Sequence, residues 1–363
     1  MAFAFFYALM GIPIARWADR GNRVAIISIT TALWSTAVVL CGLAGSFLQL
    51  LVLRIAVAVG EAGCIPPANS LLPEYFSRAE RPRAVSIYML GASLSVLMGY
   101  FGGGWLDERY GWRTTFMLLG APGFAFAVIA WLTLKEPRRS REWAPEPDFK
   151  EICVTLWSNA TFRHLLSCFA VIQFFGSGIQ QWQPTFFVRS YGLTTGDLGV
   201  WLAVMYGIGG MLGLYLGGAL ASERAANNER LQMRAMAIVY CCFAVISALI
   251  YITASRYVAL VLTGLSAAVA AAVTGPLLAT VQTLVPARTR AMSIAIIYLF
   301  SNLIGLGLGP LAAGALSDVL QPLFRQDSLR YALLVLSPGY FWAGWHLWRG
   351  SRTVTRDLAT VET

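Results

Sequence analysis

The chain has 363 residues, of which 57% are hydrophobic and only 12% are charged, and its formal net charge is +9. A soluble domain carries about twice that fraction of charged residues, so the composition predicts an all-α polytopic membrane protein. The six cysteines and two histidines show no metal-binding spacing, and the chain has no phosphate-binding loop or hydrolase motif. Neither a metal nor another cofactor is therefore expected, and an enzymatic activity is not expected.

Eleven apolar stretches follow one another along the chain, each close to the length that crosses a bilayer. Their expected bounds are 1–18, 24–44, 48–69, 84–106, 114–134, 164–188, 196–221, 235–254, 257–285, 291–317 and 329–349. The longest polar segment divides them into two groups. The predicted domains are therefore an N-terminal helical bundle (1–134), a cytoplasmic linker (135–163), a C-terminal six-helix bundle (164–350) and a cytoplasmic tail (351–363).

Basic residues alternate between the two sides of the predicted membrane. The segments expected on one side, with their flanks, hold 20 of the 27 lysines and arginines, whereas the opposite loops hold six. By the positive-inside rule this side is the cytoplasm, and the C-terminus lies there. The positive charge then reflects attraction to an anionic inner leaflet and not to nucleic acid. The sequence thus predicts an integral protein of a bacterial inner membrane, expected to be a monomer.

The two halves of the chain repeat each other. The segment 15–20 recurs at 219–224, and the segment 81–87 recurs at 288–294, so the offset grows slowly from 204 to 207 residues. A parallel duplication of this kind builds two-bundle transporters. The first half has one span fewer than the second, so we expect twelve helices in the intact fold. The first helix would then be absent through truncation or a late start site; a genuine eleven-helix protein is the alternative.

The third span contains two charged residues, Arg54 and Glu61. They are seven residues apart, which places them on one helix face, about 10 Å apart along the axis. Ionisable groups inside a span are costly and usually functional. We predict that Glu61 couples transport to protons and that Arg54 is its charge partner or an anion anchor, both in a central cavity. The alternative is polar contact between helices without a role in turnover.

The segment Asp19-Arg20-Gly21-Asn22-Arg23 resembles the loop signature of the major facilitator superfamily, with Ala15 in place of the usual leading glycine. The region from Arg54 to Tyr88, which includes Glu61, Pro66-Pro67 and Arg83, is similar to spinster-like transporters of sphingolipids and lysophospholipids, as is the glycine-rich segment 305–318. The resemblance implies two pseudo-symmetric bundles and alternating access. It also implies a lipid-like amphipathic substrate, such as a lysophospholipid or a sphingoid molecule, moved with protons.

Two other functions stay open. Symporters of sugar acids and other organic anions share much of this pattern, and Arg54 would then pair with the substrate carboxylate. A transport-inactive membrane protein is the second alternative, because the first helix, which by the resemblance supplies another acid, is expected to be absent.

Two further groups of candidate residues follow from position. The first is a cytoplasmic gate, in which Asp19 faces a helix N-terminus; it comprises Asp19, Arg20, Arg23 and Arg83. The second lines the expected substrate cavity with amide and aromatic groups; it comprises Gln173, Gln180, Trp182, Tyr206, Tyr298 and Asn302. An aromatic belt with amides reaching the interface is the alternative for the glutamines and the tryptophan.

Overall fold

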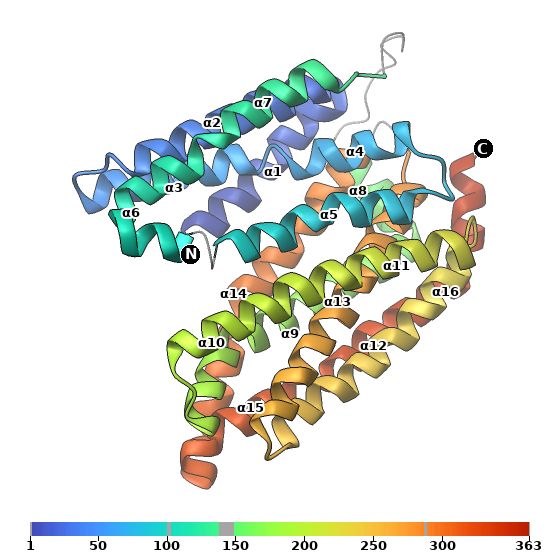
Figure 1. The fold of residues 1–363 in the computed structure, drawn as a ribbon. Helices are drawn as coiled ribbons and strands as arrows, with labels where there is room; N and C mark the ends of the chain where they lie inside the picture. The colour runs from blue at the N-terminus through green and yellow to red at the C-terminus, as the bar shows by residue number, and fades with distance from the viewer. Residues whose placement is uncertain (1, 100–102, 138–148, 287–288, 363) are drawn as a thin grey trace. The chain divides into compact units, whose positions relative to one another are not determined.

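A computed structural model of the chain describes residues 2–99, 103–137, 149–286 and 289–362. Within these residues the regular structure is helical, with no strand (Figure 1). The residues form two compact units. Unit 1 consists of Met1–Tyr75, Gly102–Ser158 and Val285–Leu299, and unit 2 consists of Phe76–Phe101, Asn159–Leu284 and Phe300–Thr363.

The units do not follow the two halves of the sequence. Unit 1 contains α1 (Ala2–Arg20), α2 (Arg23–Cys41), α3 (Phe47–Glu61), α4 (Ile65–Tyr75), α6 (Gly104–Gly120), α7 (Pro122–Thr133) and α8 (Phe149–Ser158). Unit 2 contains α5 (Arg81–Met98), α9 (Ala160–Tyr191), α10 (Thr195–Leu202), the π-helix η2 (Ala203–Gly209), α11 (Gly210–Arg224), α12 (Glu229–Ile252), α13 (Arg256–Leu284), the short 3-10 helix η4 (Arg325–Asp327), α15 (Ser328–Leu336) and α16 (Gly339–Glu362). The first ten residues of helix α14 (Arg290–Phe324) belong to unit 1, and the rest of the helix belongs to unit 2.

Eight stretches of the described residues are helical, long and apolar enough to cross a membrane. The last of them, Arg290–Ala359, covers two of the expected spans. The two expected spans outside these stretches, 1–18 and 84–106, correspond to α1 and α5 and include positions outside the described residues. Helix α16 continues to Glu362 and buries Val354 and Leu358, so the described residues of the expected tail are helical.

Polar residues cap the N-termini of several helices. The side chains of Asn22, Ser46, Asn159 and Asn228 each accept a backbone N–H three residues later, at the starts of α2, α3, α9 and α12. Helix α9 ends at Gly192, whose φ of 66° is a left-handed conformation that favours glycine. These caps fix the ends of the spans locally.

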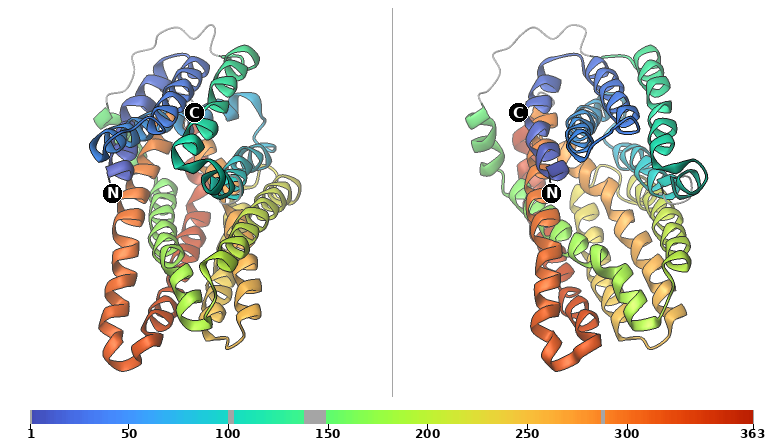
Figure 2. Two further views of the ribbon diagram at one scale, coloured as in Figure 1. Left: turned by 60° about the vertical axis from the view of Figure 1, so that its left-hand side comes forward. Right: turned by 90° about the vertical axis from the view of Figure 1, so that its left-hand side faces the viewer.

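In unit 1, α2 packs along α3 and α7 (Figure 1). Small residues permit the approach, because a Cβ at Gly60 would lie 2.6 Å from the Trp34 side chain and one at Gly123 would overlap Ser35. In unit 2, α12 packs along α16, and α16 packs along α9 (Figure 2).

The glycine stripe of α11 lies directly on α13. A Cβ at Gly213 or Gly217 would lie 2.0 Å from the carbonyl oxygen of Ala268 or Ala272, respectively. Close packing of two helices therefore accounts for this stripe.

Candidate functional site

The third span is broken at Ala62–Cys64, between α3 and α4. Pro66 and Pro67 have no N–H group, so they cannot bond to carbonyl oxygens one turn earlier. The chain makes tight turns instead: the N–H of Gly63 donates to the oxygen of Gly60 at 3.0 Å, and that of Cys64 to Glu61 at 3.1 Å. Glu61 is consequently the last residue of α3.

Contacts with α2 hold the break in place. A Cβ at Gly63 would lie 2.3 Å from Cγ2 of Thr30, so only glycine fits at this approach. The Thr31 hydroxyl lies 3.5 Å from Sγ of Cys64. The break is thus a packed feature of unit 1.

Arg54 and Glu61 lie on the same helix, α3, and the charge of Arg54 acts on the Glu61 carboxyl group. Glu61 is partly buried, whereas Arg54 is exposed. The buried residues of α3 are Val57, Ala58 and Gly60, so Arg54 precedes the buried part of the helix. The two charges differ in their access to solvent, and only the carboxylate lies at the break.

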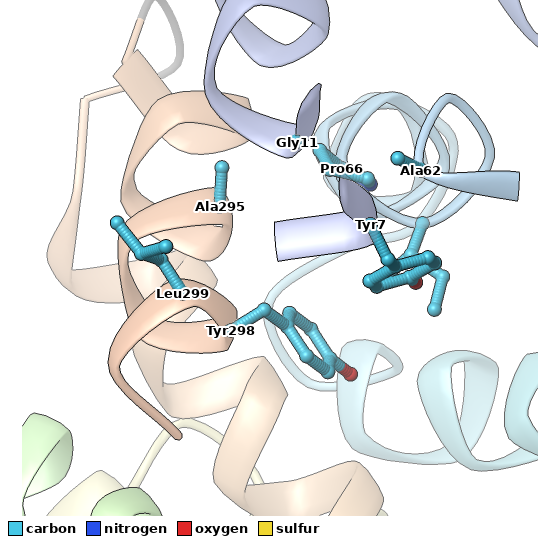
Figure 3. Close-up of a pocket in the computed structure, with 8 residues that line it drawn as sticks. Tyr7, Gly11, Ala62, Pro66, Ala295, Tyr298 and Leu299 are labelled. Carbon is cyan, nitrogen blue, oxygen red and sulfur yellow. The ribbon is translucent and has the colours of Figure 1, made fainter. Parts of the chain in front are cut away.

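A small pocket opens beside the break. Its walls come from α1, from the break and α4, and from the first turns of α14, and it is lined by Tyr7, Gly11, Ala62, Ile65, Pro66, Ala295, Tyr298 and Leu299. Figure 3 shows the rings of Tyr7 and Tyr298 directed into this space. The structure thus places Tyr298 next to Ala62, which directly follows Glu61. The pocket combines an apolar lining with phenol hydroxyl groups.

Asp19 caps a helix. Its carboxylate accepts the backbone N–H groups of Ala291 at 3.1 Å and Met292 at 2.9 Å, in the first turn of α14. Arg20, the next residue, is exposed. An acid at a helix N-terminus is stabilised by the helix dipole and by the otherwise unsatisfied N–H groups.

Arg23, another of the cytoplasmic-gate candidates, is fully buried. Its guanidinium binds Glu136 with an N···O distance of 2.5 Å and donates to the carbonyl oxygen of Ser70 at 2.9 Å. Glu74 lies 3.8 Å from both Arg23 and Arg290. Sequence reasoning missed the two glutamates, because they are separated from Arg23 by 51 and 113 residues.

Arg83 belongs to unit 2 and not to the unit of the other three gate candidates. Its backbone N–H donates to the Ser222 hydroxyl at 3.1 Å, so Ser222 serves the first turn of α5 much as Asp19 serves that of α14. Just before α5, the hydroxyl and N–H of Ser77 bind Glu80 and hold the pKa of that carboxyl group below its usual range. Ser222 lies one position before Glu223, the repeat counterpart of Asp19, so the two contacts are similar but do not involve matching positions of the repeat.

The polar candidates of unit 2 lie at several different positions along its helices. The Trp182 indole donates to the carbonyl oxygen of Pro310 at 2.9 Å. Gln173 packs against Gly305, Gln180 is exposed, and Asn302 is partly buried on α14. Trp182 and Gln173 therefore serve the contact between α9 and α14, where small residues let the helices approach.

Gln183, the neighbour of the candidate Trp182, forms a buried polar network in unit 2. Its side-chain oxygen accepts the Tyr206 hydroxyl, and its amide lies 3.5 Å from the Tyr251 hydroxyl and 3.4 Å from the Thr263 hydroxyl. Gln183, Tyr251 and Thr263 are each at most 2% exposed. Tyr206 lies in the π-helix η2, a feature that is frequent at functional sites. A π-turn has no recognisable sequence pattern, so the sequence could not indicate that Tyr206 lies in one.

Comparison with known proteins identifies the family. A model of the Major Facilitator Superfamily matches residues 1–310. The chain is 30% identical over 336 residues to an MFS-type efflux pump of Mycolicibacterium smegmatis, covering 92% of this chain and 78% of the pump. It is 25% identical to a probable sulfoacetate transporter of Cupriavidus necator, over 66% of this chain and 59% of that protein.

Comparison with solved structures supports the same family. The inward-facing, unoccupied structure of a bacterial homologue of the human lysosomal transporter spinster matches 98% of this chain and 88% of its own, with 27% identity and a TM-score of 0.64. The predicted all-α major facilitator fold and the resemblance to spinster-like proteins are confirmed. The chain belongs to the Major Facilitator Superfamily, a family of membrane transporters.

Proposed function

We propose that the protein is a proton-coupled secondary transporter that works by alternating access and carries an amphipathic lipid. One observation carries the proposal: Glu61 ends α3 at the break in the third span, beside the pocket that contains Tyr7 and Tyr298. Broken helices are the places where transporters hold coupling ions and substrates. We place the C-terminus on the cytoplasmic side of a bacterial inner membrane, on the distribution of arginine and lysine. The expected oligomeric state is a monomer.

Glu61 is suited to exchange a proton during the cycle. Wetting of a carboxyl group and its distance from a positive charge both change its affinity for a proton. Arg54 supplies that charge from the same helix. A conformational change that alters either quantity takes up or releases a proton, and protonation in turn shifts the balance of the two conformations.

The pocket favours a lipid-like substrate. Its walls are apolar apart from the tyrosine hydroxyls, which suits a molecule with a hydrocarbon portion and a polar group. Similarity to a probable sphingolipid transporter of Arabidopsis thaliana, a spinster homologue that is 28% identical over 143 residues, supports this choice of substrate class. A lysophospholipid or a sphingoid molecule has this chemistry.

An organic anion is the second candidate substrate, because Arg54 offers an exposed guanidinium group that can bind a carboxylate or sulfonate. Similarity to the sulfoacetate transporter supports it. The two candidates differ in which residue dominates binding, Arg54 for an anion and the pocket residues for a lipid.

The test is transport by the purified full chain in proteoliposomes, with and without an imposed pH gradient, using a lysophospholipid and a sugar acid as separate substrates. Glu61→Gln should bind substrate but lose its response to the gradient. Arg54→Ala should abolish anion transport, and Ala295→Phe, which fills the pocket, should abolish lipid transport. Full gradient-driven accumulation by Glu61→Gln contradicts the coupling role. Absence of transport of either substrate by the wild type would indicate a transport-inactive protein.

A further inference from the structure

Helix α16 presents an aromatic and basic face that the bundle leaves exposed. Phe341, Trp342, Trp345, Trp348, Arg349 and Arg352 fall within one arc of about 120° when 100° is allowed for each residue. The aromatic members are between 40% and 55% exposed, whereas Ala343 and Leu347 on the opposite side, and His346 at the edge of the arc, are buried. Along the helix the aromatic residues come first and the arginines follow. This is the order of a membrane interface, with indoles at the boundary and cations beyond it.

Two guanidinium groups stack on these indoles. Arg349 lies 5.6 Å from the ring centre of Trp345, and Arg234 of α12 lies 5.4 Å from that of Trp348. Nε of Arg234 is buried and has no hydrogen-bond partner among the described residues. Stacking leaves the edge of a guanidinium group available to an oxyanion. Arg349 and Arg352 are exposed, so this face can donate hydrogen bonds to a ligand that accepts them from arginine.

Two histidines connect α9 to α16 beside this face. Nδ1 of His164 on α9 lies 3.1 Å from Nδ1 of His346 on α16, and the His164 ring meets Trp345 edge-on. Arg163 is exposed beside this pair, and its charge and that of Arg349 both act on His164. Arginines from α9, α12 and α16 thus gather at the same end of unit 2.

No acidic residue of these segments offsets the arginines. Helix α9 has no aspartate or glutamate, and α16 has none before Asp357. Asp357 already accepts hydrogen bonds from Arg356 and Thr161, and Glu229 of α12 is bound by Arg78 at 2.6 Å and 2.8 Å. The face therefore carries a net positive charge, which favours binding of an anion.

We propose that this face, defined by Arg234, Trp345, Trp348, Arg349 and Arg352, binds the phosphate of an anionic phospholipid of the cytoplasmic leaflet. The orientation rests on the function proposed above. The indoles cover the glycerol region, and the guanidinium groups bind the phosphate oxygens, as in basic sites for lipid headgroups on membrane proteins. A phospholipid fits better than a free anion, because the aromatic residues continue the site towards the hydrocarbon region.

The test measures lipid retention and needs no transport. The full chain is exchanged into detergent with equal amounts of phosphatidylglycerol and phosphatidylcholine, and bound lipid is counted by native mass spectrometry. Wild type should retain phosphatidylglycerol preferentially. Arg349→Gln and Arg234→Gln should each weaken that retention about fivefold, and Trp345→Leu should weaken it as well. Thermal unfolding of each variant identifies any that fail to fold.

Arg256→Gln is the matched control. Arg256 also stacks on an aromatic ring, that of Tyr257 at 4.7 Å, but it lies at the start of α13. It should retain phosphatidylglycerol as the wild type does. Unchanged retention in the folded Arg349→Gln and Arg234→Gln variants, or equal loss in the control, overturns the proposal. Displacement of the lipid by an equal concentration of inorganic phosphate would also overturn it. Loss of transport in any variant bears only on the proposed function.

Discussion

The carboxylate of Asp19 lies 2.9 Å from the backbone nitrogen of Met292, although the two residues are 273 positions apart in the chain. The contact joins the end of α1 to the first turn of α14 inside unit 1. A helix N-terminus carries unsatisfied N–H groups and a partial positive charge, so a carboxylate there replaces a conventional cap.

Asp19→Asn should slow transport without preventing membrane insertion. The substitution keeps the size of the side chain but removes the charge, which is worth about 0.3–2 kcal/mol at a helix N-terminus. Initial rates in proteoliposomes measure the effect. Glu223→Gln changes the exposed repeat counterpart of Asp19 and should leave the rate unchanged. A wild-type rate for Asp19→Asn would show that this cap is not used as a latch.

Arg23→Gln should destabilise unit 1 strongly. It leaves the Glu136 carboxylate without its buried partner, and removal of one member of a buried ion pair costs about 3–5 kcal/mol. The thermal unfolding midpoint in detergent should fall, and Arg23→Lys should restore only part of it, because an ammonium group cannot reproduce the fork geometry. Arg20→Gln, at the exposed last residue of α1, is the control. Equal midpoints for the two glutamine variants would contradict the role of the network.

Gly217→Ala should disturb the packing of α11 on α13. The added Cβ would lie 2.0 Å from the carbonyl oxygen of Ala272, and overpacking of this kind costs about 1–3 kcal/mol. The measurement is again the unfolding midpoint. Gly199→Ala adds the same methyl group where no heavy atom lies within 4 Å, so it should be neutral or raise stability by up to about 1 kcal/mol. If Gly199→Ala were the more harmful change, helix contact would not be the cause.

Tyr206→Phe and Gln183→Leu should destabilise unit 2 less than additively when combined. The phenylalanine leaves the Gln183 oxygen without its donor, and an unsatisfied buried polar group costs about 1–3 kcal/mol. The leucine removes that unsatisfied group together with its other hydrogen bonds. A double-mutant cycle on thermal stability gives the coupling between the two residues. Strict additivity would mean that the hydroxyl and the amide do not interact in the folded protein.

The sequence by itself determined the class of fold and much of the local structure. A long apolar stretch with few charged residues forms a membrane-spanning helix whatever its position in the chain. Capping residues such as Asn22 and Asn159 bind backbone groups only three residues away. The repeat and the loop that begins at Asp19 were enough for the superfamily. The prolines at positions 66 and 67 act equally locally, because neither has an N–H group with which to continue the helix that ends at Glu61.

Only the tertiary structure decided which residues meet. The burial of Arg23 depends on Glu136, the cap provided by Asp19 depends on α14, and the network around Gln183 depends on a π-turn at Tyr206. The same structure leaves Gln180 exposed and gives Trp182 a packing role. The physical reason is that hydrophobicity and backbone preference act along the chain, whereas the partner of a buried polar group is chosen by helices that are distant in sequence and adjacent in space.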